Sequence, residues 1–166
     1  MDKVSRRLIG PPPKRVTSLS PKVNLGNRLL IGTHRRQIDE KGRISLAVFS
    51  DQLMRVALFL VVTKAEETQI KHLKVFDSAT WTNIYEGLTD QETQTRFFDS
   101  SYDTSLDKAA RLTLSQDCRQ TANFADNIAV VRGCGRHLEI YQRSDWDKTN
   151  SSINEGTLSP FLIPRK

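Results

Sequence analysis

Two short turns of this sequence carry an aspartate and an arginine at the same spacing. The first runs from Asp39 to Arg43 as Asp-Glu-Lys-Gly-Arg, and the second runs from Asp107 to Arg111 as Asp-Lys-Ala-Ala-Arg. Basic side chains bind phosphates, and arginine can also donate two hydrogen bonds to the edge of a guanine. These residue types therefore favour recognition of a polyanion such as DNA.

The first turn places two basic residues on one side of the chain. Lys41 and Arg43 are two residues apart, so on an extended segment they point the same way. Gly42 between them lets the backbone close tightly. Arg35 and Arg36 lie upstream and can extend this surface. The alternative interpretation is a solvated charged turn, which is the commoner case for an arbitrary protein.

The paired aspartates have a rival interpretation as an acid protease dyad. Such a dyad needs two carboxylates held close together among small, hydroxyl-bearing residues. Asp39 is instead followed by Glu40 and Lys41, and Asp107 by Lys108. An aspartate that hydrogen-bonds the backbone of its own turn is the favoured role, because it would orient the loop that carries the arginine.

The histidines and tryptophans have structural interpretations. His34 stands alone in a predicted strand, where it could contact DNA but more often has a packing role. His72 and His137 occupy equivalent strand starts, which indicates a shared packing or edge role. Trp81 and Trp146 are predicted core anchors of two helices. The sequence shows no catalytic triad and no phosphate-binding glycine loop, so we predict no enzyme, metal or cofactor.

The charge of the chain is concentrated at its beginning. Lys and Arg number 25 against 19 Asp and Glu, which gives +6 and a sequence pI near 9.5. Residues 1–28 hold seven basic residues and one acid, or 7 − 1 = +6, and the remainder holds 18 − 18 = 0. A basic surface on the body must therefore come from local clustering.

Cysteine usage and hydropathy indicate a cytoplasmic protein. Cys118 and Cys134 form neither a disulfide framework nor a metal-binding quartet. The longest apolar run, residues 56–62, is too short to span a bilayer. The basic start of the chain leads into a proline run without an apolar segment, which argues against a signal peptide.

The body contains an internal repeat. The segment from His72 to Phe76 matches the segment from His137 to Tyr141, with an offset of 137 − 72 = 65. Upstream, residues 38–46 match residues 106–114, with an offset of 106 − 38 = 68. A short insertion or deletion accounts for the difference, so the repeat predicts two copies of one folding unit.

Each copy predicts the same order of elements. An alternating strand follows the turn, and then come a short helix, two more strands and a closing helix. The closing helix begins near Ser78 or Ser144, and each of these serines is the expected N-cap. The predicted strands are residues 44–46, 58–63 and 73–76, and 112–114, 128–132 and 138–141; the short helices are residues 48–54 and 116–124. The fold class is therefore mainly β with short helices, arranged with pseudo-two-fold symmetry.

Composition and the repeat together predict five segments. They are a flexible basic arm (residues 1–28), a first unit (29–88), a linker (89–104), a second unit (105–148) and a loose tail (149–166). The arm and the tail are rich in polar residues and proline, and they lack the apolar area that offsets the entropy of ordering.

Four stretches of the sequence resemble the MraZ family. They are GTHRRQIDEKGRISL from Gly32, TRFFDSS from Thr95, LDKAARLTL from Leu106, and VVRGCGRHLEIYQRSDW ending at Trp146. The resemblance implies two AbrB-like, swapped-hairpin units in tandem, which would form a β-barrel body. It also implies a ring-shaped homo-oligomer that binds double-stranded DNA at promoter repeats of the division and cell-wall gene cluster.

The resemblance also assigns site residues. The DNA-binding turn of the family falls on these positions: Asp39, Lys41, Gly42 and Arg43 in the first unit, and Asp107 and Arg111 in the second. The turn glycine of the second unit is replaced by Ala110, whose Cβ disfavours a positive φ. We therefore expect the second turn to close less well and to contribute less to DNA binding.

The sequence thus predicts a sequence-specific, DNA-binding transcriptional regulator that is cytoplasmic and associated with the nucleoid. The alternative is a non-enzymatic, ring-forming interaction protein, or an AbrB-type antitoxin, with reduced DNA contact. Salt-dependent DNA binding distinguishes the two, because phosphate contacts weaken as salt rises.

Overall fold

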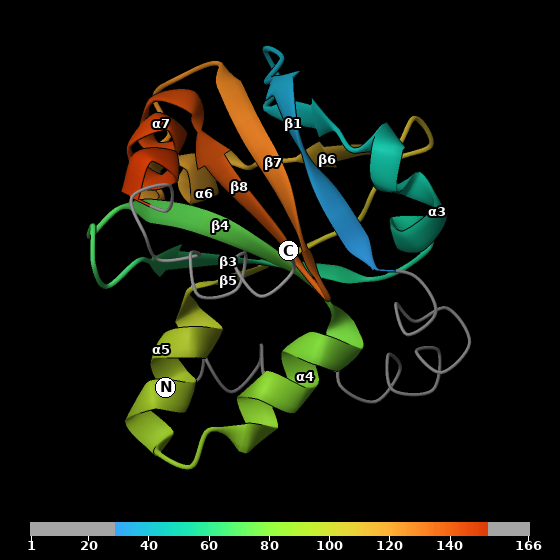
Figure 1. The fold of residues 1–166 in the computed structure, drawn as a ribbon. Helices are drawn as coiled ribbons and strands as arrows, with labels where there is room; N and C mark the ends of the chain where they lie inside the picture. The colour runs from blue at the N-terminus through green and yellow to red at the C-terminus, as the bar shows by residue number, and fades with distance from the viewer. Residues whose placement is uncertain (1–28, 153–166) are drawn as a thin grey trace, which may run out of the picture.

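Alternating apolar residues build most of this fold as antiparallel strands. The computed structural model describes residues 29–152, and the side chains of residues 29–149. Six strands form one sheet (Figure 1). In spatial order they are β1 (Leu30–Gln37), β7 (Ile128–Gly135), β8 (Leu138–Gln142), β4 (Lys71–Asp77), β3 (Leu58–Lys64) and β5 (Ser101–Thr104). The prediction of a mainly β fold with short helices is confirmed.

The sheet is open, and the prediction of a closed barrel is wrong. Of the described strands, β1 pairs with β7 alone and β5 pairs with β3 alone. Closure would require β1 and β5 to hydrogen-bond to one another, but they form the two edges of the sheet. The backbone groups along the outer sides of these two strands are therefore not paired within the sheet.

Pairing crosses between the two repeated blocks of sequence. The strand before the first turn, β1, pairs with a strand of the second block, and the strand before the second turn, β5, pairs with a strand of the first. The equivalent strands β4 and β8 meet in the middle, with Lys74 opposite Glu139. Neither block completes its own sheet, so the two must fold together.

A separate two-stranded ribbon holds the strands that follow the two turns. It pairs β2 (Arg43–Ser45) with β6 (Arg111–Thr113), and Ile44 lies opposite Leu112 at its centre. Both of these central side chains are completely buried. The ribbon is therefore fixed to the core by one face, and its other face is left to polar residues.

The main core fills the space between the ribbon, the short helices and one face of the sheet. Its largest completely buried side chains are aliphatic except for one phenylalanine: Leu30, Ile44, Leu46, Phe49, Leu53, Leu58, Leu60, Leu73, Leu112, Leu114, Leu138 and Ile140. Burial of each such side chain contributes about 1.5–3 kcal/mol. Both repeated blocks supply these residues, as the alternating patterns predicted.

A second apolar cluster lies on the opposite face of the sheet, beneath α4 (Ser78–Gly87) and α5 (Gln91–Asp99). Figure 1 shows these two helices side by side along the β3 and β5 end of the sheet. Trp81 is buried there and stacks on Phe59 at 4.5 Å between ring centroids. Both α5 and β5 lie in the segment that the sequence predicted as a linker.

The remaining helices are short. They are η2 (Ala47–Phe49), α3 (Ser50–Leu53), α6 (Gln116–Thr121) and α7 (Arg143–Ser152). In the part of the chain that the structure describes, no helix is long and apolar enough to cross a membrane. The predicted arm and most of the predicted tail, residues 1–28 and 153–166, lie outside the described residues.

Two details of the predicted helices are wrong. The N-cap of α4 is Asp77, whose carboxylate accepts a hydrogen bond from the N–H of Thr80, whereas Ser78 is inside the helix and donates to the carbonyl of Ala57. Trp146 is only partly buried, and its ring lies 5.9 Å from the guanidinium carbon of Arg132. It covers a charged side chain at the sheet surface and does not anchor the core.

Candidate nucleic-acid interface

The first turn is closed by its own aspartate. Oδ1 of Asp39 accepts hydrogen bonds from the backbone N–H groups of Lys41 and Arg43, each at 2.9 Å. Oδ2 accepts a hydrogen bond from Nε of Arg43 at 2.7 Å. The backbone N–H of Arg43 lowers the pKa of this carboxyl most strongly, desolvation raises it by a smaller amount, and the guanidinium of Arg43 and the backbone N–H of Lys41 lower it further. Asp39 is therefore an ionised anchor for both the turn and the arginine.

The second turn repeats this geometry atom by atom. Oδ1 of Asp107 accepts from the N–H groups of Ala109 and Arg111 at 2.9 Å, and Oδ2 accepts from Nε of Arg111, also at 2.9 Å. The pKa of Asp107 is lowered by the same causes in the same order, beginning with the N–H of Arg111. Each aspartate thus has both oxygens occupied by its own turn, which is incompatible with a shared protease dyad.

Our expectation that Ala110 would hinder the second turn is wrong. Ala110 adopts φ +60° where Gly42 adopts φ +79°, and the backbone hydrogen bond that closes the turn is 2.9 Å in both. The surrounding hydrogen bonds of Asp107 hold the alanine in a region that costs it about 1–3 kcal/mol. Strain is therefore accepted at Ala110, and the shape of the turn is kept.

The two turn residues support a prediction about stability. A Cβ built at Gly42 would lie 2.5 Å from the carbonyl oxygen of Leu114, so Gly42→Ala adds a steric conflict to a positive φ. We expect Gly42→Ala to lower the free energy of unfolding by about 2 kcal/mol or more, and Ala110→Gly to raise it by up to about 1 kcal/mol. Urea unfolding followed by circular dichroism measures both. A stable Gly42→Ala variant would contradict the close approach to Leu114.

Each turn is also fixed by the other repeated block. The N–H of Leu114 donates to the carbonyl of Gly42 at 2.7 Å, and the N–H of Leu46 donates to the carbonyl of Ala110 at 2.8 Å. These two bonds extend the β2–β6 ribbon at both of its ends. The two turns are therefore held at a fixed separation by one rigid ribbon. A binding site needs such rigid support to keep its side chains in position.

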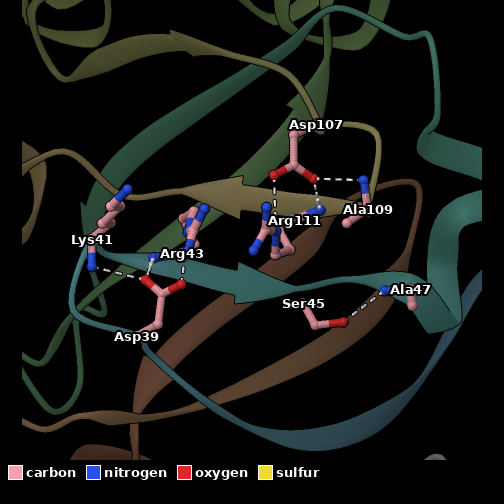
Figure 2. Close-up of polar contacts among 8 residues, drawn as sticks. All are labelled: Asp39, Lys41, Arg43, Ser45, Ala47, Asp107, Ala109 and Arg111. Atoms are coloured by element: carbon pink, nitrogen blue, oxygen red, sulfur yellow. Dashed lines mark hydrogen bonds and ion pairs between the residues drawn. The ribbon is translucent and has the colours of Figure 1, made fainter.

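The outer face of the ribbon gathers four polar side chains, which alternate with the buried Ile44 and Leu112. They are Arg43, Ser45, Arg111 and Thr113. Arg43 lies opposite Thr113, and Ser45 lies opposite Arg111, so the two arginines are diagonal neighbours across the strands. Figure 2 shows the two aspartates at opposite edges of the ribbon, with the arginine side chains between them.

The aspartates orient both arginines but bind only part of each guanidinium group. Asp39 and Asp107 bind the Nε atoms, and the side chains of Arg43 and Arg111 keep 28% and 37% of their surface exposed. Neither terminal guanidinium nitrogen of these residues takes part in the hydrogen bonds of the two turns. The terminal fork is the part of an arginine that donates two parallel hydrogen bonds to a phosphate or to a guanine.

Sequence reasoning missed one basic residue at this site. The guanidinium of Arg119, on α6, lies 3.3 Å from the position that a Cβ of Gly42 would take, and its buried Nε has no hydrogen-bond partner. Arg119 belongs to the second repeated block, and the corresponding position of the first block is Asp51. No local spacing links Arg119 to the first turn, so only the three-dimensional arrangement reveals it.

Arg35 and Arg36 do not add a joint surface. They are consecutive residues of β1, so their side chains leave opposite faces of the strand. A guanidinium nitrogen of Arg35 lies 4.0 Å from a carboxylate oxygen of Asp147 on α7, and Arg36 donates to the carbonyl of Arg35. His34, on the same strand, packs its ring edge to face with Phe49 at 5.6 Å, which is a packing role.

Comparison with known proteins gives a consistent result. Residues 97–159 match a family model described as "MraZ protein, putative antitoxin-like". Three relatives are named transcriptional regulator MraZ. The protein of Frankia alni is 31% identical over 147 residues, covering 82% of this chain and 98% of the relative. The protein of Salinispora tropica is 32% identical over 128 residues (72% and 85%), and that of Roseiflexus castenholzii is 26% identical over 135 residues (76% and 90%).

Proposed function

Because this chain belongs to the MraZ family of transcriptional regulators, we propose that it binds DNA in a sequence-specific manner through the outer face of its β2–β6 ribbon. The observation that carries the proposal is the pair of arginines on one rigid ribbon, each held at Nε by an aspartate. The major groove is wide enough for a two-stranded ribbon, so Arg43 and Arg111 would contact guanine edges there.

Neighbouring basic residues would contact the phosphates in this arrangement. Lys41 and Lys108 are exposed at equivalent ends of the ribbon, one in each turn, and Arg119 lies against the first turn. Phosphate contacts position a protein on the duplex without reading its sequence. We therefore assign Arg43 and Arg111 to base recognition and the other three to phosphate binding.

We further propose that residues 29–88 and 105–148 are two AbrB-like units in the swapped-hairpin arrangement. The exchange of strands between the repeated blocks supports this interpretation, because each block supplies a strand to the other. The DNA sites would be short repeats upstream of division and cell-wall genes, and the protein would act in the cytoplasm at the nucleoid. A transcriptional regulator is not a class of enzyme, and the proposal assigns no reaction to this chain.

Gel-shift titration tests the proposed function directly. The probe is the DNA immediately upstream of the protein's own gene, compared with a scrambled duplex of equal length at several salt concentrations. We expect tighter binding to the upstream DNA. We also expect the logarithm of the binding constant to fall by about one unit per phosphate contact for each tenfold rise in salt concentration. Equal and weak binding to both duplexes would refute it.

Assembly into a ring-shaped homo-oligomer is part of the same proposal. The exposed large apolar side chains of the described residues are Leu29, Ile31 and Val48, and Ile31 keeps 72% of its surface exposed on the edge strand β1. Apolar side chains beside an unpaired strand edge favour contact with another copy of the chain. Multi-angle light scattering at micromolar concentration should show a large homo-oligomer, and a stable monomer would contradict the multivalent model.

A second candidate function follows from the words "antitoxin-like" in the description of the matching family model. In that case the chain would bind a partner protein, and contact with DNA would be reduced. The gel-shift experiment separates the two candidates, because an interaction protein would not distinguish the upstream DNA from the scrambled duplex at any salt concentration.

A further inference from the structure

A carboxylate and two histidines face one another on the sheet, away from the ribbon. Glu139 lies on β8 between Leu138 and Ile140, which point into the main core, so its side chain lies on the opposite face. Its Oε2 is 3.8 Å from Nε2 of His137 and 3.9 Å from Nε2 of His72. These separations are too long for hydrogen bonds.

The two histidines carry buried nitrogens that lack partners. His72 is 4% exposed, and neither of its ring nitrogens has a hydrogen bond. Nε2 of His137 is also buried and without a partner. Leaving a buried polar group unpaired costs about 1–3 kcal/mol, and such groups are rare in native proteins. Unpaired nitrogens that converge on one carboxylate oxygen indicate that a ligand completes the cluster.

The thiol of Cys134 also lies near His137 and Glu139. Sγ of Cys134, one ring nitrogen of His137 and a carboxylate oxygen of Glu139 all lie within 4.8 Å of one another. The hairpin between β7 and β8 produces this arrangement, since the N–H of Cys134 donates to the carbonyl of His137 at 2.8 Å across a two-residue loop. Sulfur, imidazole and carboxylate together are a donor set that Zn²⁺ prefers.

The distances are compatible with a metal ion. Bonds of about 2.0–2.3 Å place the ligand atoms of a tetrahedral zinc site roughly 3.3–3.8 Å apart. The separations of 3.8 and 3.9 Å from Oε2 to the histidines are close to this range, and the thiol needs a movement of about 1 Å at most. Rotation of the Cys134 side chain supplies such a movement, because the hydrogen bond from its thiol to the carbonyl of Arg132 is long, at 3.8 Å. His72 lies near Glu139 but outside the group of three ligand atoms that are mutually within 4.8 Å, so its ring must also move to reach the ion.

Neighbouring side chains orient the carboxylate for this role. Its other oxygen, Oε1, accepts from the guanidinium of Arg132 at 3.3 Å and from the hydroxyl of Tyr141 at 3.1 Å. Oε2 is thereby left to face the histidines. Partners that fix a ligand from behind are typical of metal sites. Arg132 and Lys74 bring positive charge, which repels a divalent cation. The negative charges of the Cys134 thiolate and of Glu139 would offset this repulsion.

We propose that Cys134, His137 and Glu139 bind one Zn²⁺ ion per chain and that the ring of His72 moves to supply the fourth ligand. The ion would connect β4, β7 and β8, the three adjacent strands on which the exchange of strands between the repeated blocks depends. Its role would be to stabilise this central part of the sheet. The site is independent of the ribbon, so the proposal does not rest on DNA binding.

Titration of the tag-free, metal-stripped full chain tests the proposal. Calorimetric titration with Zn²⁺ should show one ion bound per chain. The Tm of the chain should rise by about 5–10 °C at a free Zn²⁺ concentration near 100 times the Kd. Co²⁺ should produce the intense visible bands of a tetrahedral site and a thiolate-to-cobalt absorption. Failure of the parent to bind micromolar Zn²⁺ would overturn the proposal and leave the cluster a purely structural one.

The two cysteines supply a matched pair of variants. Cys134→Ser should remove the thiolate-to-cobalt absorption and weaken Zn²⁺ binding by at least 10- to 100-fold, since even an outer partner of a metal ligand has an effect of about that size. Cys118→Ala should keep both, because Cys118 lies in the main core. His72→Gln, as a second variant, should also weaken binding at least tenfold. Unchanged binding by Cys134→Ser or by His72→Gln would overturn the assignment of that ligand.

Discussion

Replacement of Arg43 with alanine should weaken binding to the upstream DNA by about 5- to 150-fold for each contact that is lost. This range corresponds to the roughly 1–3 kcal/mol of discrimination that one bidentate contact between arginine and guanine provides. If several subunits bind several repeats at once, the losses multiply, and specific binding should disappear. Gel-shift titration against the upstream and the scrambled duplex measures the change.

The loss should concern specific binding more than folding or assembly. Arg43 is anchored to Asp39 in a partly exposed ion pair, whose removal should cost the fold little compared with the loss of a DNA contact. Arg143→Ala, on the exposed start of α7, is the matched control and should bind DNA like the parent. Lys41→Ala should weaken binding to both duplexes alike, since it removes a phosphate contact. An Arg43→Ala variant with the affinity of the parent would refute the assignment of this turn to DNA recognition.

The parts of the fold that local pattern controls were predictable from the sequence. The strands from Leu58, Lys71, Ile128 and Leu138 alternate or cluster apolar residues, and their interiors were predicted at nearly the right positions. The aspartate and arginine turns were also identified, because their spacing recurs in both repeated blocks.

The missed elements depend on partners far away in sequence. β5 reads SYDT and was not predicted, and β1 reads LIGTHRRQ, of which the sequence placed only His34 in a strand. Both are too polar for the alternation that indicates a strand. They are strands because β7 and β3 supply hydrogen-bonding edges at distant points of the chain. The position of Arg119 beside Gly42 and the approach of His72 to Glu139 are likewise consequences of tertiary structure, which no local pattern contains.

The expectation that Ala110 would hinder the second turn was wrong, although the local rule behind it is correct. An alanine at positive φ is unfavourable by itself, and this favours an altered turn. Six hydrogen bonds nevertheless oppose any alteration. Three go to the carboxylate of Asp107, two join the turn backbone (Ala110 N–H to the Asp107 carbonyl and Asp107 N–H to the Arg111 carbonyl), and one runs from the N–H of Leu46 to the alanine carbonyl. Their combined contribution exceeds the strain, so the second turn keeps the shape of the first.

Arg111→Ala should consequently be about as damaging as Arg43→Ala, which reverses the expectation from the sequence. The two guanidinium groups have the same anchor, similar exposure and diagonal positions on one ribbon. Diagonal neighbours in a sheet are about 7–8 Å apart, which corresponds to about two base-pair steps of roughly 3.4 Å. Arg43 and Arg111 would therefore contact guanines two steps apart in the same groove.

The proposed spacing of the two arginines predicts how substitutions in the DNA repeat affect binding. Substitution of either guanine in the DNA repeat should weaken binding by the parent, and each arginine variant should become insensitive to substitution of one guanine while keeping its response to the other. Titration of the parent and both variants against the two substituted duplexes measures this pattern. If Arg111→Ala binds like the parent while Arg43→Ala does not, only the first turn reads DNA, and the equal geometry of the two turns has no counterpart in recognition.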